Sequence, residues 1–266
     1  MSDVAPQAPP PGPLEKPVKL GLSFTPTPVS AVAGVLNSAA IIGGDKSGKT
    51  TLGGSASAIP ALIAANKKTL ILTSETGSAS IADDYPLAEQ FHLTNKLGFD
   101  KAVDELMTRD HSYGVVVIDT YDKFQSYASE WFLANYGSDT RYAYGLLKKW
   151  TLETAWKLHK APFTVIFLFH SETVKDDRNG ALSESFKLIG SAGDEIGEVF
   201  DLIGFLTVED DAEGNAQRVL QLGPKVGVKA GNRWEKKLPR KMVNATMAEI
   251  ISIIRTPNPT TPEIKE

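Results

Sequence analysis

The chain of 266 residues contains no cysteine, which excludes disulfide bonds, thiolate metal sites and cysteine nucleophiles. It also lacks a long hydrophobic run, because its longest apolar stretch, residues 163–169, is far too short to span a bilayer. The N-terminus has no basic start followed by an apolar segment, so we expect no export signal. These absences predict a cytoplasmic protein with no membrane partner.

An excess of charge of one sign is missing too, since the formal net charge is only −4 at pH 7. A nucleic acid would therefore have to be bound by a local basic patch and not by the surface as a whole. The hydrophobic content of 42% and the charged content of 23% are usual for a globular chain with a substantial core. Length and composition together predict one large domain, with or without tails.

Prolines cluster near both ends of the chain. Residues 1–17 are rich in proline and have almost nothing apolar to bury, which predicts a disordered leader. This leader could be a plain linker or a ligand for an SH3-type domain. Residues 256–266 are a similar polar tail. We therefore predict a folded domain over residues 18–255.

What the chain does contain is a complete phosphate-binding loop of the form G-x-x-x-x-G-K-[ST]. Its residues are Gly43, Gly44, Asp45, Lys46, Ser47, Gly48, Lys49 and Thr50, and we include the following Thr51 in the predicted nucleotide site. Small apolar residues at 38–42 predict a buried strand before the loop. Residues 51–65 predict a helix after it, which Pro60 should kink or end early.

Each part of this loop suits a phosphate ligand. Glycines let consecutive backbone N–H groups surround an anion without Cβ clashes, and the start of the following helix adds partial positive charge. Lys49 would reach the β- and γ-phosphates, and the Thr50 hydroxyl would hold Mg²⁺. The loop therefore predicts that the protein binds ATP together with Mg²⁺.

The rest of the chain alternates apolar runs with segments of helical periodicity. Strands are predicted at residues 68–73, 113–119 and 163–169. Helices are predicted at residues 99–108, 123–135, 141–160 and 247–254. Two β-rich segments separated by a turn, residues 205–208 and 218–222, predict an antiparallel hairpin. Continuous apolar strands between helices are typical of an α/β fold whose mostly parallel sheet is flanked by helices.

Three of these strands end in a residue that can do chemistry, namely Glu75, Asp119 and His170. In an open α/β sheet, ligands bind outside the carboxyl ends of the strands, where the phosphate loop also lies. Asp119 could hold Mg²⁺ through water, or it could cap the next helix. Glu75 could act as a general base on water, and His170 could sense the γ-phosphate. Each of the last two could also be only a polar end of its strand.

The order of these features resembles the RecA-like P-loop ATPase core over about residues 36–254. The chain looks most like compact phage-encoded nucleotide-binding proteins with an AAA domain, some of which are assigned to single-strand annealing or recombination. The resemblance implies that Glu75 is the catalytic glutamate, Asp119 the Walker-B aspartate and His170 the γ-phosphate sensor. It implies Mg²⁺-dependent ATP hydrolysis by a homo-oligomer that acts on single-stranded DNA. Tyr85 falls near the position of the family's adenine-stacking aromatic residue.

The resemblance also gives a meaning to two polar segments. Residues 171–193 correspond to the loop that contacts single-stranded DNA in RecA-like proteins, although they could equally be a solvated loop. Their cations, Lys175, Arg178 and Lys187, are diluted by acidic neighbours. Residues 229–233 resemble the Lys/Arg signature that DnaB-like helicases insert into a neighbour's nucleotide site. Because Gly231 replaces the second basic residue of that signature, Arg233 is the better catalytic candidate.

Residues 225–241 are rich in lysine and arginine, with Trp234 among them. A basic segment that contains an aromatic residue suits single-stranded nucleic acid, but it could also be a solvated surface or face an acidic neighbour. Two other functions stay open, a small-molecule P-loop kinase and a nucleotide-dependent scaffold with a protein partner. The chain shows no lid segment with clustered arginines, which argues against the kinase.

Overall fold

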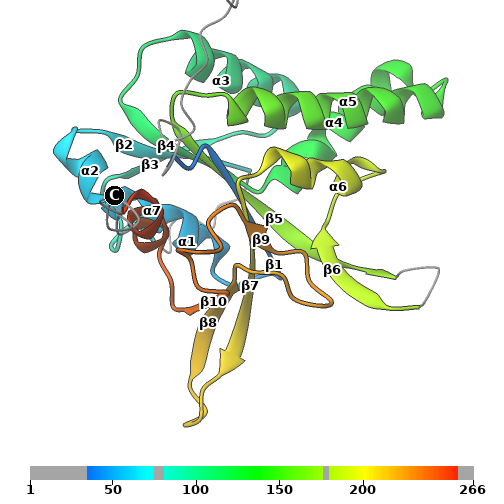
Figure 1. Cartoon of the computed structure of the whole chain (residues 1–266). Coiled ribbons are helices and arrows are strands. Elements are labelled where there is room, and N and C mark those ends of the chain that lie inside the picture. The colour runs from blue at the N-terminus through cyan, green and yellow to red at the C-terminus, as the bar shows by residue number, and fades with distance from the viewer. Residues whose placement is uncertain (1–34, 75–80, 176–179, 257–266) are drawn as a thin grey trace, which may run out of the picture. The chain divides into compact units, whose positions relative to one another are not determined.

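The structure is a computed structural model that describes residues 35–74, 81–175 and 180–256 (Figure 1). The predicted leader and all of the predicted tail except Thr256 lie outside these ranges, so the domain boundaries stay a prediction. The described residues form a ten-stranded mixed sheet that is flanked by helices, as the sequence pattern predicts. No helix in these ranges combines the length and the apolar composition that a membrane span requires.

The strands of the sheet follow the order β10-β8-β7-β1-β5-β4-β2-β3, with β6 paired to β5 and β9 paired to β7. Their bounds are β1 (Ser38–Gly43), β2 (Lys68–Thr73), β3 (Ala88–His92), β4 (Tyr113–Asp119), β5 (Thr164–Lys175), β6 (Leu182–Phe186), β7 (Leu202–Asp210), β8 (Ala216–Gln221), β9 (Gly231–Asn232) and β10 (Lys241–Val243). Strands β7, β1, β5, β4, β2 and β3 run parallel. The other strands pair antiparallel, which includes the predicted β7–β8 hairpin.

The helices connect these strands and cover both faces of the sheet (Figure 1). Their bounds are α1 (Lys49–Gly54), α2 (Pro60–Ala64), α3 (Lys96–Thr108), α4 (Tyr121–Tyr136), α5 (Thr140–His159), α6 (Ala192–Glu195) and α7 (Met247–Arg255). The predicted early end of the first helix is confirmed. A 3₁₀ turn, Ser55–Ala58, follows α1, and Pro60 begins α2, where a missing backbone N–H costs no hydrogen bond.

The central strands are buried on both faces, as continuous apolar runs require. In β4, Val116 and Ile118 face a core that is shared with α3, α4 and α5, whereas Val115 and Val117 face a second core with α1 and α7. Side chains alternate in this way because the side-chain period of a strand is two residues. The double burial holds the carboxyl ends of these strands at fixed positions, and those ends carry the candidate site.

The predicted DNA-binding loop at residues 171–193 is mostly not a loop, which corrects the sequence-based expectation. Strand β5 continues past His170 to Lys175, and β6 returns antiparallel beside it. The physical reason is an aromatic anchor: the ring of Phe186 in β6 is fully buried, with its centroid 4.7 Å from that of Phe169. Arg178 lies outside the described residues.

Candidate functional site

The phosphate loop leaves the sheet at its centre, between the end of β1 and the start of α1. Gly43 closes β1 between β5 and β7, and a Cβ there would lie 2.7 Å from the carbonyl oxygen of Leu206. Gly48 has a φ of 96°, in the left-handed region that other residues rarely adopt. Gly43 is therefore required by the close approach of β7, and Gly48 by the left-handed backbone of the loop.

Lys49 is buried at the base of this loop. Its ammonium Nζ donates hydrogen bonds to the carbonyl oxygens of Gly43, at 2.9 Å, and Gly44, at 2.7 Å. These bonds hold a positive charge against the loop, since a buried cation needs acceptors to offset its lost hydration. The lysine is thus already positioned where the motif needs it.

Asp119 reaches the same place from the end of β4. Its carboxylate Oδ2 accepts a hydrogen bond from the Thr50 hydroxyl at 2.8 Å, and the side chain is buried. The adjacent strand supports it, because Thr73 pairs with Asp119 and the Ser74 N–H donates to the Asp119 carbonyl oxygen at 3.0 Å. The structure therefore brings the two predicted metal-binding oxygens together.

This donor set fits Mg²⁺. Magnesium usually takes one or two carboxylates plus water and substrate phosphates, so a hydroxyl and a carboxylate beside a phosphate loop are sufficient. In keeping with this, the described ranges contain no cluster of three or more His, Asp or Glu that could hold a metal by itself. Four buried hydroxyls in the same ranges have no hydrogen-bond partner, and two of them belong to the site: Ser47 in the loop and Thr120 next to Asp119. Unpaired polar atoms at such a position suit a polar ligand, because an unsatisfied buried hydroxyl is costly.

His170 connects the phosphate loop to the first turn of α4. Its Nδ1 lies 2.8 Å from Oδ2 of Asp122, and its Nε2 lies 3.1 Å from Oδ1 of Asp45 in the loop. The backbone N–H of His170 also donates to Asp122 at 3.0 Å. The hydrogen bond to Asp122 raises the pKa of His170 above its ordinary value. A half-buried imidazole in this position can respond to charge that arrives at the loop.

The phosphate loop, Asp119 and His170 line one cavity of about 760 Å³. Its walls are residues 45–51 of the loop together with Asp84, Asp119, Thr120, His170 and Arg218. The lining is largely polar, which suits phosphates better than an apolar ligand. The sequence pointed to the loop, Asp119 and His170, and the structure brings residues 45–51 of the loop, Asp119 and His170 to this cavity.

Among the predicted residues that the structure describes, Gly43, Gly44, Tyr85 and Arg233 do not line this cavity. Glu75 lies outside the described residues, directly after Ser74 in the sequence. Tyr85 lines a separate hollow of about 130 Å³ with Ile81 and Ala88. Its ring packs near Gly54, where an added Cβ would lie 3.3 Å from the Tyr85 Cδ2 atom.

Arg233 lies at the opposite end of β1 from the phosphate loop. Its guanidinium forms an ion pair of 2.9 Å with Asp201, a buried carboxylate. Asp201 also accepts hydrogen bonds from the backbone N–H groups of Asn37, at 2.9 Å, and Ser38, at 3.3 Å, at the start of β1. Arg233 is therefore remote from the loop of its own chain, and its predicted role concerns a neighbour's site.

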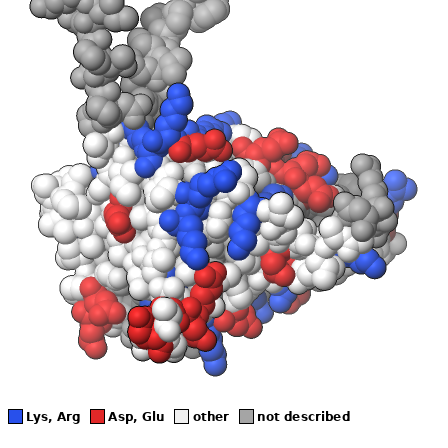
Figure 2. All heavy atoms as spheres, turned by 60° about the horizontal axis from the view of Figure 1, so that its bottom comes forward, with Lys and Arg blue, Asp and Glu red and all other residues white. Residues whose placement is uncertain are grey.

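Four cations of the basic segment at residues 225–241 bind groups of their own chain, namely Lys229, Arg233, Lys237 and Lys241, and the nucleic-acid interpretation of this segment stays a prediction. Lys229 donates to the Gly193 carbonyl oxygen at 2.9 Å, and burial lowers its pKa. Lys237 bonds the last carbonyl oxygens of α7, Lys241 pairs with Glu209, and Trp234 packs against the core. On the face drawn in Figure 2, lysine and arginine alternate with acidic groups.

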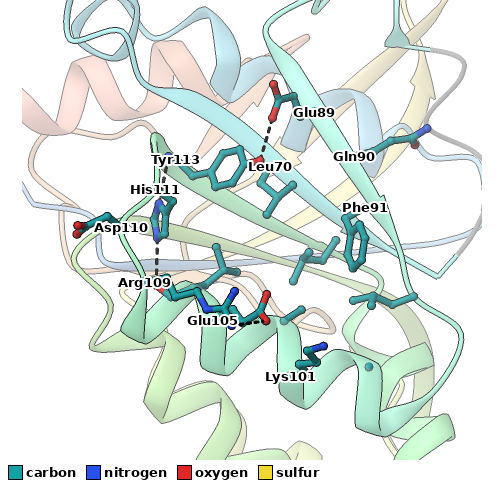
Figure 3. Close-up of a pocket in the computed structure, with 15 residues that line it drawn as sticks. Leu70, Glu89, Gln90, Phe91, Lys101, Glu105, Arg109, Asp110, His111 and Tyr113 are labelled. Atoms are coloured by element: carbon teal, nitrogen blue, oxygen red, sulfur yellow. Dashed lines mark hydrogen bonds and ion pairs between the residues drawn. The ribbon is translucent and has the colours of Figure 1, made fainter.

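A second cavity, of about 470 Å³, lies between the edge strand β3 and α3 (Figure 3). Leu70, Leu72 and Phe91 give it apolar walls. At its rim the Tyr113 hydroxyl donates to Glu89 at 2.8 Å, and burial is the main cause that raises the Tyr113 pKa. The phosphate loop does not line this second cavity. Of the two cavities, the polar one is therefore the candidate nucleotide site.

A family model described as an AAA domain matches residues 37–234. The chain belongs to the AAA domain family. The matched range runs from just before β1 to just after β9, so the AAA domain contains the phosphate loop and every residue that lines the polar cavity. A search of curated proteins found no match. The AAA domain and the mostly parallel sheet identify an α/β P-loop NTPase fold, and the family indicates a nucleotide-binding ATPase.

Sequence reasoning missed four residues in or beside the cavity: Asp84, Thr120 and Arg218, which line it, and Asp122, which binds His170. Asp122 could have been found, because it stands just before the predicted helix at residues 123–135 and three residues after Asp119. Arg218 had no local signal, since it is one exposed residue of a hairpin strand whose position depends on the sheet register.

Proposed function

We propose that the protein binds ATP with Mg²⁺ at the phosphate loop and hydrolyses it. The observation that carries this proposal is the hydrogen bond between Thr50 and Asp119 beside the buried Lys49, within one polar cavity. Phosphoryl transfer depends on positioning and on stabilisation of phosphate charge. The cavity supplies both positioning and charge stabilisation, because a cation, a metal-binding pair and a loop of backbone N–H groups meet there.

Each side chain has a distinct task in this proposal. The backbone N–H groups of the loop and the Lys49 ammonium bind the phosphates, and Lys49 exchanges its carbonyl acceptors for phosphate oxygens. Thr50 and Asp119 would hold Mg²⁺, directly and through water respectively. When bound there, Mg²⁺ neutralises charge on the β- and γ-phosphates.

Glu75 and His170 would act where the water attacks the γ-phosphate. We assign Glu75 as the general base that takes a proton from the attacking water. The assignment rests on the resemblance to RecA-like ATPases and on its place two residues after Thr73, the last residue of β2, which pairs with Asp119. His170 would read the γ-phosphate through its link to Asp45 in the loop. The proton removed from water passes to the Glu75 carboxylate, and the leaving group is ADP.

The test of this function is ATP binding and turnover by the purified full-length chain and by Lys49→Ala. Loss of the ammonium should abolish most nucleotide affinity or turnover while the thermal unfolding transition stays cooperative. Lys149→Ala is a matched control, because Lys149 is an exposed lysine of α5. Equal ATP binding and hydrolysis by a folded Lys49→Ala protein would refute the proposal.

We further propose that the ATPase acts on single-stranded DNA, as a homo-oligomer, in recombination or annealing of the phage type. The supporting observation is the continuity of β5, which carries His170 and then runs without a break into the exposed β5–β6 hairpin. Lys175 and Lys187 are exposed on that hairpin. A ligand bound there could move the strand that reads the phosphate.

Measuring ATP turnover with and without single-stranded DNA separates this role from its rivals. DNA should raise turnover in the wild type and in Lys149→Ala, and should raise it much less in a Lys175→Ala/Lys187→Ala double variant. Turnover that is unchanged by DNA would favour a nucleotide-dependent scaffold with a protein partner. Transfer of phosphate to a small molecule would favour a kinase.

A further inference from the structure

The side chain of Arg218 lies directly over the phosphate loop of its own chain. A Cβ added to Gly48 would lie 2.2 Å from Nε of Arg218 and 2.7 Å from its Cδ. The arginine therefore packs against the loop backbone just before Lys49, and it lines the same cavity as Lys49, Thr50 and Asp119.

The sheet register explains how a hairpin residue reaches the loop. Gly43 at the end of β1 pairs with Leu206, and Leu206 pairs with Leu220 of β8. Arg218 is two residues nearer the hairpin tip and on the same face as Leu220, because side chains alternate along a strand. Leu220 is buried in the core beneath α1. Arg218 consequently projects past the end of β1, where the phosphate loop begins.

The backbone of Arg218 is held on both sides. On one side it pairs with Val208 of β7. On the other, its N–H donates to Oδ1 of Asn244 at 2.9 Å, and the Asn244 N–H donates back to its carbonyl oxygen at 2.7 Å. A residue fixed in this way projects its side chain from a rigid element, which is what a binding group needs.

The guanidinium of Arg218 has no anionic partner in the part of the chain that the structure describes, where no carboxylate comes within the 4.0 Å that defines an ion pair. Arg233 differs, because it is paired to Asp201. A guanidinium is always charged, and its planar fork of N–H donors matches phosphate oxygens. An arginine without such a partner, beside a phosphate loop, is poised for a phosphate ligand.

We propose that Arg218 is a phosphate-binding residue that acts in cis, so that the β7–β8 hairpin contributes to the nucleotide site of its own chain. This inference rests on the proposed nucleotide function of the same cavity. When nucleotide is present, the Arg218 guanidinium would form hydrogen bonds with the phosphates. The β7–β8 hairpin would therefore be linked directly to the bound nucleotide.

Nucleotide affinity of Arg218→Ala, measured with ATP, ADP and AMP, tests the proposal. Hydrogen bonds to charged groups correspond to about a ten- to hundredfold loss of affinity, so Arg218→Ala should bind ATP and ADP that much more weakly. Arg218→Lys should keep part of the affinity. Arg141→Ala, which removes an exposed arginine of α5, is the matched control and should bind as wild type does.

Chemical rescue separates phosphate binding from mere support of the loop. Methylguanidinium at millimolar concentration should restore part of the ATP affinity of Arg218→Ala, and urea at the same concentration should not. Wild-type affinity in Arg218→Ala, or a loss that methylguanidinium fails to restore, would overturn the assignment of Arg218 and leave the proposed ATPase standing. A wild-type protein that binds no nucleotide would overturn both.

Discussion

The imidazole Nδ1 of His170 lies 2.8 Å from the carboxylate Oδ2 of Asp122, which raises the pKa of His170 above 6.5. A group whose pKa is raised by folding stabilises the protein fully below its unfolded pKa, and this stabilisation is lost as the pH rises through the folded pKa. The unfolding temperature of the wild type relative to His170→Gln should therefore be highest below about pH 6.5 and decline above it.

Thermal unfolding of both proteins between about pH 5.5 and pH 9 measures this difference. Comparing two proteins at each pH cancels other groups, such as His159, whose pKa burial lowers. A difference that is constant over this range would mean that Asp122 only orients a neutral imidazole.

Asp119→Asn should raise the Mg²⁺ concentration needed for half-maximal ATP turnover. The amide keeps an acceptor for the Thr50 hydroxyl, so the fold should survive, but the negative charge is lost. Residues that hold a metal through a second layer of contacts are typically worth about ten- to a hundredfold in metal affinity. Asp83→Asn, at an exposed aspartate, is the control. Identical Mg²⁺ titrations of both variants would remove Asp119 from the metal site.

Glu75→Gln should slow ATP hydrolysis by about a hundredfold or more and leave ATP binding intact. The amide has nearly the same shape as the carboxylate but cannot accept the proton from water, and general-base loss has this usual scale. Binding titrations and single-turnover hydrolysis separate the two effects. If hydrolysis proceeds at the wild-type rate, the base is a different residue.

The elements that the sequence predicted well are those with strong local patterns. The β-branched run Tyr113–Asp119 is strand β4, and the phosphate loop lies between a buried strand and a helix. Strand β3 was missed because Ala88–His92 is a half-exposed edge strand without a continuous apolar run. The β5–β6 hairpin was taken for a loop because its polar residues hide the pairing that Phe186 anchors.

The site residues, too, could be predicted only where a local pattern or a general rule identifies them. Asp119 and His170 follow from the rule that ligands bind at the carboxyl ends of strands, a rule that needs no knowledge of the sheet order. Arg218 requires the register of β1, β7 and β8, which no local pattern gives. The pairing of cations in the basic segment could not be predicted either, because their partners, among them Asp201 and Glu209, come from other elements.

Arg233 should act on the nucleotide of an adjacent subunit, because its own phosphate loop lies at the other end of β1. An arginine supplied in trans stabilises charge on the transferred phosphate and is worth about three to five orders of magnitude in rate. Arg233→Ala should fold, since Asp201 keeps the N–H donors of Asn37 and Ser38. Specific activity of the wild type should rise with protein concentration as subunits meet.

Mixing two inactive variants tests this arrangement directly. Arg233→Ala subunits retain Lys49, and Lys49→Ala subunits retain Arg233, so a mixed assembly contains some interfaces with both residues. The mixture should therefore recover part of the wild-type turnover, while each variant alone stays inactive. A mixture of Arg218→Ala and Lys49→Ala subunits should recover no additional turnover. Arg218 and Lys49 would serve the nucleotide site of the same chain, so no interface in this mixture restores a site with both residues. No rescue by Arg233→Ala, together with activity independent of concentration, would leave Arg233 as the ion-pair partner of Asp201 alone.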